Sequence, residues 1–245
     1  MNDNLPSTAS NSADKVTAFA KGVLGAVPFV GPMAAEIVGA VIPNQRVDRL
    51  VRFFELLEER VKHLEQASFY EKCLEQDSVD LIEDALLQSA RAKSEERLNY
   101  IADIVANGLV SGEKERLESQ KMLWLLEKVS NIEVILLRGQ LPGDGDEYRA
   151  DAKFQTTHNE ILKSRALDMG SSDEEFDEEA LYSSFKMHLV DLTLLRPNFR
   201  KPRRGESPEF DHRTGKMKAS GHAVTRLGKM LLRQLKLMPE WLEPT

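Results

Sequence analysis

The longest apolar stretch of the chain covers residues 17–42 and contains only two charged side chains. Pro28 and Pro32 disfavour helix at the residues before them, so the pattern predicts two short helices, 14–26 and 33–42, joined by a turn. Each arm would be about 15–20 Å long, whereas the hydrocarbon layer of a bilayer is about 30 Å thick. Neither arm is therefore long enough to span a membrane, and the stretch is expected to form a hairpin.

Small residues recur four positions apart along both arms, which lets two helix backbones approach closely. They are Ala18, Gly22, Ala26, Gly31, Ala35 and Gly39. The large apolar residues of the same stretch must be shielded from water and are candidates for membrane or partner contact. They are Phe19, Val23, Leu24, Phe29, Val30, Ile37 and Val41. Three alternatives remain open: a hairpin buried in its own core, a single transmembrane helix, and a hairpin sheltered in one state and released in another.

The next segment has the most regular hydrophobic pattern in the protein. Apolar residues alternate three and four positions apart, which predicts a helix with one apolar stripe. The stripe consists of Val47, Leu50, Phe54, Leu57, Val61 and Leu64. We expect it to pack within its own chain, with a homo-oligomeric coiled coil as the alternative.

Helical periodicity continues through the middle of the chain. It predicts helices at 69–76, 79–92, 94–109, 114–129, 131–138 and 153–166, and another within 171–195. Ser78 and Ser94 are expected to cap the helices that follow them, and Ser130 with Glu133 has the spacing of a capping box. In the helix within 171–195 we expect a buried stripe of Leu181, Phe185, Leu189, Leu192 and Leu195.

The C-terminal part has a different pattern: a short strand at 194–199, a long polar connection, a second strand from His222, and an amphipathic helix. This order, with the segment VTRLGKMLLRQL, resembles the end of a winged-helix domain. Seven cations cluster in the connection: Arg200, Lys201, Arg203, Arg204, Arg213, Lys216 and Lys218. They are candidates for polyanion contact, either non-specific nucleic acid or anionic lipid, against the alternative of a solvated loop.

These elements predict a mainly α protein with two folded parts. A leader at 1–13 is expected to be disordered, and a helical domain at 14–112 includes the Gly/Ala-rich hairpin at 14–43. A winged-helix-like α+β module follows at 113–245, with the basic wing at 196–218. Long runs of Val, Ile and Thr, which would suggest a sheet, are missing from the sequence.

Charge adds an asymmetry that the hydrophobic pattern does not show. The 245 residues have a net charge of −7, but residues 196–236 alone have twelve basic and three acidic side chains. An acidic body with a basic end favours a polyanion partner for that end or contact between the two parts. The single cysteine, Cys73, excludes an internal disulfide and fits a reducing compartment, so we expect a cytoplasmic protein, peripheral to the inner membrane if the hairpin is released.

Motifs for catalysis are missing from the sequence. It has no P-loop, no Gly-x-Gly-x-x-Gly, no His-Glu-x-x-His and no Gly-x-Ser-x-Gly. The five histidines are scattered, and no cysteine or carboxylate spacing fits a metal site. We therefore expect no cofactor, no metal and no enzymatic activity.

Four segments in order resemble bacterial helical proteins related to the abortive-infection alpha family. They are VPFVGPMAAEIVGAVIP, NQRVDRLVRFFELLEERV, SEERLNYIADIVANGL and TRLGKMLLRQL. The resemblance implies a bacterial phage-defence or toxin-like protein that acts without catalysis, here through a releasable hairpin on the inner membrane or a protein partner. The competing hypothesis is a winged-helix protein that associates with nucleic acid through its basic wing.

Overall fold

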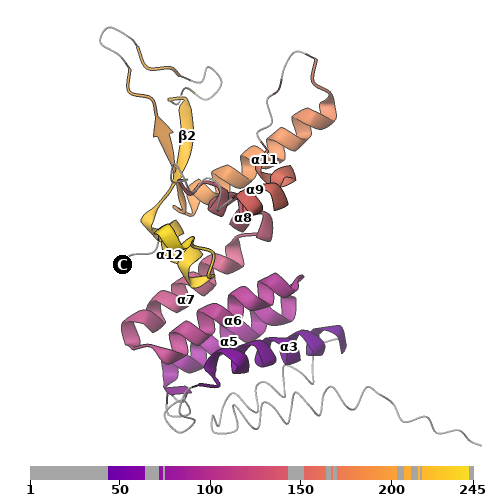
Figure 1. The fold of residues 1–245 in the computed structure, drawn as a ribbon, viewed down its shortest axis with the longest axis vertical. Coiled ribbons are helices and arrows are strands. Elements are labelled where there is room, and N and C mark those ends of the chain that lie inside the picture. The colour runs from indigo at the N-terminus through magenta and orange to yellow at the C-terminus, as the bar shows by residue number, and fades with distance from the viewer. Residues whose placement is uncertain are drawn as a thin grey trace, which may run out of the picture. The chain divides into compact units, whose positions relative to one another are not determined.

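The computed structural model describes residues 44–63, 72–73, 75–142, 152–163, 167, 170–202, 207–210, 215 and 217–242. The leader and the apolar hairpin predicted for residues 1–43 lie outside this part of the chain. The described chain is mainly helical with a small antiparallel sheet, as the hydrophobic pattern predicted (Figure 1). It divides into two compact units, of which the first ends at Glu127 and also includes Gln234–Lys236.

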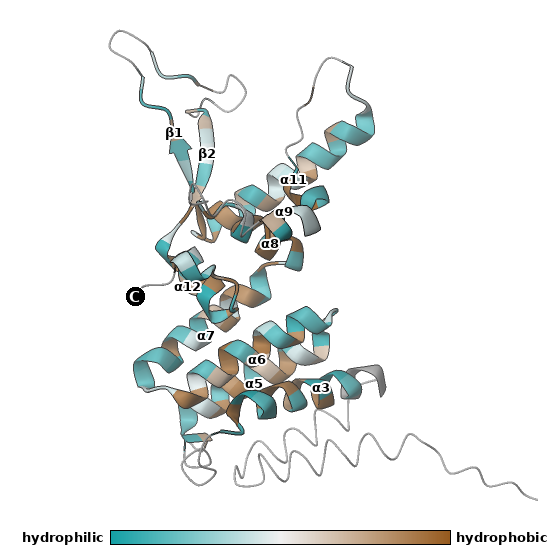
Figure 2. Ribbon diagram, in the orientation of Figure 1, coloured by the Kyte–Doolittle hydropathy of each residue, from teal (hydrophilic) through white to brown (hydrophobic). Residues whose placement is uncertain are grey.

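The first unit is built from α3 (Asn44–Val61), α5 (Gln76–Arg91), α6 (Glu95–Val110) and most of α7 (Glu113–Lys128). Helix α3 packs against α6 and α5, and α5 packs against α6. Figure 2 shows hydrophobic residues on the sides of these helices that face one another. Helices α3, α5 and α6 therefore each pack against the other two.

The apolar stripe of α3 packs within its own unit. The buried residues of the helix are Leu50, Phe53, Phe54, Leu56, Leu57 and Val61. The side chains of Val47 and Leu64 lie outside the described residues. Phe53 and Leu56 widen the predicted stripe, because α3 faces both α5 and α6. The four described stripe residues therefore need no second copy of the chain to cover them.

A close approach between α5, α6 and α7 depends on Gly108. A Cβ atom at this position would lie 2.6 Å from Leu81 Cδ2 and 2.9 Å from Ser119 Cβ. Ser119 and Ser78 are fully buried, so small side chains fill the space where these helices meet. The prediction that Ser78 caps a helix is wrong, because α5 already begins at Gln76.

Two other predicted helix starts are confirmed. The Ser94 side chain accepts a hydrogen bond from the backbone N–H of Arg97, 3.2 Å away. At the start of α8 (Asn131–Gly139), Ser130 Oγ accepts from the Glu133 backbone N–H, and the Glu133 carboxylate accepts from the Ser130 N–H. This capping box fixes where the chain turns from α7 into the second unit.

The boundary between the compact units falls after α7, whereas the sequence suggested a boundary before it. Several polar contacts hold α7 to the earlier helices. Gln120 Nε2 donates to the Asp77 carbonyl at 3.0 Å, and Gln88 Nε2 donates to the Leu123 carbonyl at 3.1 Å. Arg116, which is buried, pairs with the Glu75 carboxylate. Side-chain contacts of this kind are not visible in hydrophobic periodicity, which explains the difference.

The second unit contains α8, α9 (Ala152–Thr157), α10 (Asn159–Leu162), α11 (Asp173–Asp191), β1 (Leu195–Phe199), β2 (Ala219–Val224), α12 (Arg226–Gln234) and η2 (Glu240–Leu242). The helix predicted for 153–166 is broken at His158 into α9 and α10. Helix α11 begins at a second capping box, formed by Ser172 and Glu175, and packs against α8 and β1.

The buried face of α11 differs from the predicted one. Tyr182 and Leu189, seven residues apart, are its buried side chains, whereas Leu181 is 58 % exposed. Leu181 lies one residue away from Tyr182, which places it about 100° around the helix. The prediction that Leu181 belongs to the core is therefore wrong, and the N-terminal half of α11 is largely hydrophilic (Figure 2).

The two strands form an antiparallel pair that begins with Leu195 opposite Val224. The register shifts between Asn198 and Phe199, and the Ser220 hydroxyl donates to the Asn198 carbonyl at 3.1 Å beside the shift. Such a bulge increases the local twist of a hairpin. Strand β2 begins at Ala219, slightly earlier than the sequence suggested, and leads through Thr225 directly into α12.

Candidate polyanion-binding surface

The basic wing predicted from the sequence is described only in part. Arg200, Lys201 and Lys218 are described, and all three are exposed. Arg203, Arg204, Arg213 and Lys216 lie outside the described residues, so the structure does not test their predicted contacts.

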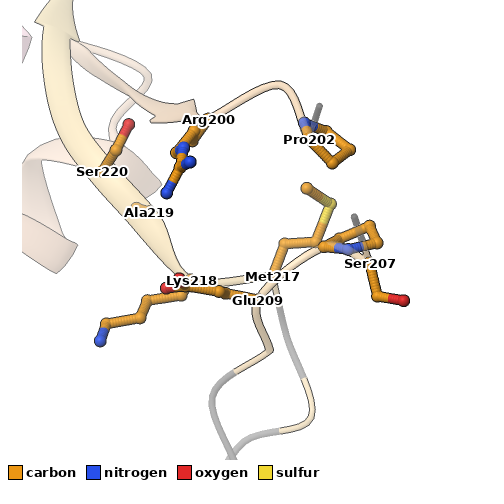
Figure 3. Close-up of a pocket in the computed structure, with 9 residues that line it drawn as sticks. Arg200, Pro202, Ser207, Glu209, Met217, Lys218, Ala219 and Ser220 are labelled. Atoms are coloured by element: carbon orange, nitrogen blue, oxygen red, sulfur yellow. The ribbon is translucent and has the colours of Figure 1, made fainter. Parts of the chain in front are cut away.

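A small pocket of about 110 Å³ lies between the two sides of the wing. Arg200 and Pro202 come from the segment after β1, and Glu209 and Met217 come from the segment that returns to β2 (Figure 3). The Lys218 backbone N–H donates to the Glu209 carbonyl at 2.9 Å, which ties the returning segment together. Glu209 lines this pocket together with Arg200 and Lys218, so its negative charge makes the pocket less suited to an anion than a lining of cations alone.

A larger hollow of about 680 Å³ lies beside α12, within the second unit. We call it the α12 hollow. Four cations line it: Arg196, Arg226, Lys229 and Arg233. Its apolar lining consists of Val224, Met230, Trp241 and Leu242, and Thr225 also lines the hollow. No acidic residue of the described chain lines this hollow.

The three cations of α12 share one side of the helix because they are three and four residues apart. The opposite side buries Gly228, Leu231 and Leu232. The sequence spacing of Arg226, Lys229 and Arg233 could have identified this basic face, although our sequence analysis did not single it out. Arg196 and Trp241 could not have been found in this way, because only the fold brings them to α12.

A tight junction positions the start of α12. Thr225 Oγ1 accepts a hydrogen bond from the Gly228 backbone N–H at 3.0 Å and donates to the Thr193 carbonyl at 2.7 Å. The Thr225 backbone N–H donates to the Leu194 carbonyl at 3.0 Å. Thr193 itself has a φ of 58°, in the left-handed region, where it ends α11 and turns the chain into β1. The helix is thus fixed to the base of the hairpin that holds Arg196.

The side chains of the four cations of the α12 hollow have no hydrogen bond or ion pair with another residue in the part of the chain that the structure describes. Cations on protein surfaces usually have acids interspersed among them, which weakens the local potential. Here four positive charges converge on a hollow whose described lining has no counter-charge. Such an arrangement attracts anions and suits phosphate groups, which Arg binds in a bidentate manner and Lys as a point charge.

His222 in β2 does not add to this positive potential at neutral pH. Burial, together with the nearby charge of Lys186, lowers the pKa of His222 below its ordinary value of 6.5. The imidazole is therefore neutral at pH 7. The positive charge that lines the α12 hollow comes from Arg and Lys side chains, which stay charged across neutral pH.

Two buried ionisable groups of the first unit, Asp103 and Cys73, belong to its packed interior. Asp103 in the first unit accepts from Arg60 Nε at 2.7 Å and lies 2.7 Å from Lys236 Nζ. Burial raises the pKa of Cys73 to about 12, so its thiol is protonated and unreactive at neutral pH. Among the described residues no group of His, Cys, Asp and Glu has the arrangement of a metal site.

No described helix is both long and apolar enough to cross a membrane. The residues predicted for membrane or partner contact, and those predicted for close helix packing, lie outside the described part of the chain. No protein-family model, curated protein or solved structure matches the chain significantly. Its functional interpretation therefore depends on the residues and the geometry described above.

Proposed function

We propose that the second unit binds nucleic acid through its phosphate backbone, without reading the base sequence. The observation that carries this proposal is the α12 hollow, where four cations converge and no acidic residue is among the described lining residues. Phosphate contacts made by Arg and Lys provide most of the affinity of non-specific nucleic-acid binding. The exposed cations of the wing extend the same charge along the hairpin.

The order of elements in the second unit is compatible with a winged-helix module. Helices α8 and α11 precede a two-stranded hairpin, and α12 follows it. In a sequence-reading member of this class, a helix would present Arg, Lys, Asn or Gln to the major groove. The first turn of α11 instead contains Asp173, Glu174 and Glu175, which repel phosphate. Contact through the wing and α12 is therefore favoured over base reading by α11.

The test is binding of the full chain to fluorescent oligonucleotides over a range of salt concentrations. Wild type should bind at low salt, and the logarithm of its association constant should fall linearly with the logarithm of the salt concentration. Each lost contact with a duplex phosphate removes about 0.9 from the slope. The triple variant Arg226→Ala/Lys229→Ala/Arg233→Ala should bind less tightly and show a slope that is shallower by about 3.

A matched control removes the same charge elsewhere. Lys62, Lys93 and Lys114 are exposed in the first unit, and the triple alanine variant of these residues should leave affinity and slope nearly unchanged. If the two triple variants weaken binding equally, the effect reflects net charge alone and the site is not at α12. Absence of binding by wild type at low salt would remove the proposal altogether.

A further inference from the structure

We infer that the α12 hollow holds one unpaired nucleotide of a single strand, with its base against Trp241 and its phosphates against the surrounding cations. This inference rests on the proposed function and adds the type of nucleic acid that is preferred. A surface that binds only phosphates needs cations but no apolar lining. The α12 hollow has both, and the apolar part includes an aromatic ring.

The three α12 cations and the aromatic ring come from different elements of the fold. Arg226, Lys229 and Arg233 come from one side of α12, whereas Trp241 and Leu242 come from η2. A nucleotide has the matching division, because its phosphates are charged and its base is a flat aromatic surface. The volume of about 680 Å³ lies within the range of about 300–1,000 Å³ that is usual for small-ligand pockets.

The Trp241 ring offers carbon surface to the hollow. Its Nε1 atom is buried and has no hydrogen-bond partner in the described chain, while the residue as a whole is half-buried. The accessible part of the ring is therefore apolar, which suits stacking. Loss of one base–aromatic stack lowers affinity by about 5- to 100-fold, and the stack accepts any base.

Base pairing decides which form of nucleic acid can use this ring. In a duplex, each base is already stacked between its neighbours and paired with its partner. A base in a single strand is free to leave the stack and cover an aromatic side chain. Trp241 therefore adds affinity for single strands only, whereas the four cations serve both forms.

The experiment compares an oligothymidylate of about 15 nucleotides with a duplex of the same length, using the full chain. Wild type should prefer the single strand. Trp241→Ala should lower single-strand affinity by about 5- to 100-fold and leave duplex affinity unchanged, and Trp241→Phe should restore most of the loss. Trp124→Ala is the matched control and should leave both affinities unchanged. Trp124 lies on α7, is 43 % exposed, contacts Lys121 Nζ with its ring, and is far from the hollow in sequence.

A second measurement does not depend on the stability of the alanine variant. The chain has two tryptophans, so Trp124→Phe leaves Trp241 as the only indole fluorophore. Oligothymidylate should quench its emission in proportion to binding, and the duplex should not. An unchanged emission spectrum at saturating oligothymidylate would overturn the inference.

The outcomes separate this inference from the proposed function. Salt-dependent binding with equal affinity for both forms, unaffected by Trp241→Ala, leaves the proposed function standing and overturns the inference. Failure of both forms to bind overturns both. Two further probes identify other sources of phosphate. The single-strand assignment is wrong if ATP quenches Trp241 emission and oligothymidylate does not. It is also wrong if binding to phosphatidylglycerol vesicles depends on Trp241 and binding to oligothymidylate does not.

Discussion

At the scale of single residues, Gly228 shows how one position can fix the geometry of the α12 hollow. A Cβ atom there would lie 2.5 Å from the Leu194 carbonyl oxygen and 2.8 Å from Val224 Cγ1. The Leu194 oxygen is a backbone atom that also accepts from Thr225 N–H, so it cannot move without disturbing the junction. Only glycine fits between α12 and the base of the hairpin.

We therefore predict that Gly228→Ala destabilises the second unit by about 1–3 kcal/mol, the usual cost of overpacking. The control is Gly221→Ala, because nothing lies within 4 Å of a Cβ at position 221 and the effect should stay within about 0.5 kcal/mol. Chemical denaturation followed by circular dichroism measures both. Equal stability of the two variants would show that α12 can move away from Leu194.

A second residue-scale prediction concerns Asp103, whose side chain is only 6 % exposed. Asp103→Ala leaves the Arg60 guanidinium, 15 % exposed, without its counter-charge, which should cost about 3–5 kcal/mol. Lys236→Ala removes the other cation, which is 64 % exposed, and should cost less than about 1 kcal/mol. Thermal unfolding of both variants tests this asymmetry, and similar losses would contradict it.

At the scale of elements, α3 and α12 show two uses of helical periodicity. The apolar residues of α3 face its own unit, so the pattern specifies an internal contact. The cations of α12 share the side opposite its buried residues, so the pattern there specifies an exposed surface. Helix α11 is the exception. Much of its N-terminal half has no buried face, so the positions of its hydrophobic residues do not predict which side of the helix is buried.

We predict that Leu57→Asp unfolds the first unit instead of dissociating an oligomer. Leu57 is 3 % exposed, and a buried carboxylate adds to the cost of about 2–5 kcal/mol for losing a large apolar side chain. Wild type should then unfold at a denaturant midpoint that is independent of protein concentration. The control Glu58→Ala, at an exposed neighbouring position, should be close to wild type.

The opposite result would have a clear meaning. A wild-type midpoint that rises with protein concentration, together with a folded monomeric Leu57→Asp variant, would show that the stripe is an interface between chains. Analytical ultracentrifugation of both proteins distinguishes the cases.

At the scale of the whole molecule, charge is divided unequally along the chain. The basic residues between 196 and 236 belong mainly to the hairpin and α12, whereas the rest of the chain is acidic. In the proposed function, the acidic body repels a polyanion, so the polyanion contacts the basic end of the chain. The predicted release of the apolar hairpin stays a prediction because residues 14–43 lie outside the described chain. The resemblance to abortive-infection proteins stays a prediction because no known protein matches the chain.

The sequence by itself determined the mainly helical class, the α3 stripe, the helix starts at Ser94 and Ser130, and the presence of a hairpin before the last helix. These features depend on local spacing and on side chains that bond to nearby backbone, so the order of residues is sufficient to predict them. It also located the excess of positive charge.

Only the tertiary structure decided where those charges meet. Arg196 in β1 and Trp241 in η2 are far apart in sequence, and they line one hollow because Thr225 and Gly228 fix α12 against the base of the hairpin. The unit boundary after α7 likewise depends on contacts such as Gln120 with the Asp77 carbonyl. Contacts between distant residues depend on packing in three dimensions, which periodicity along the chain does not specify.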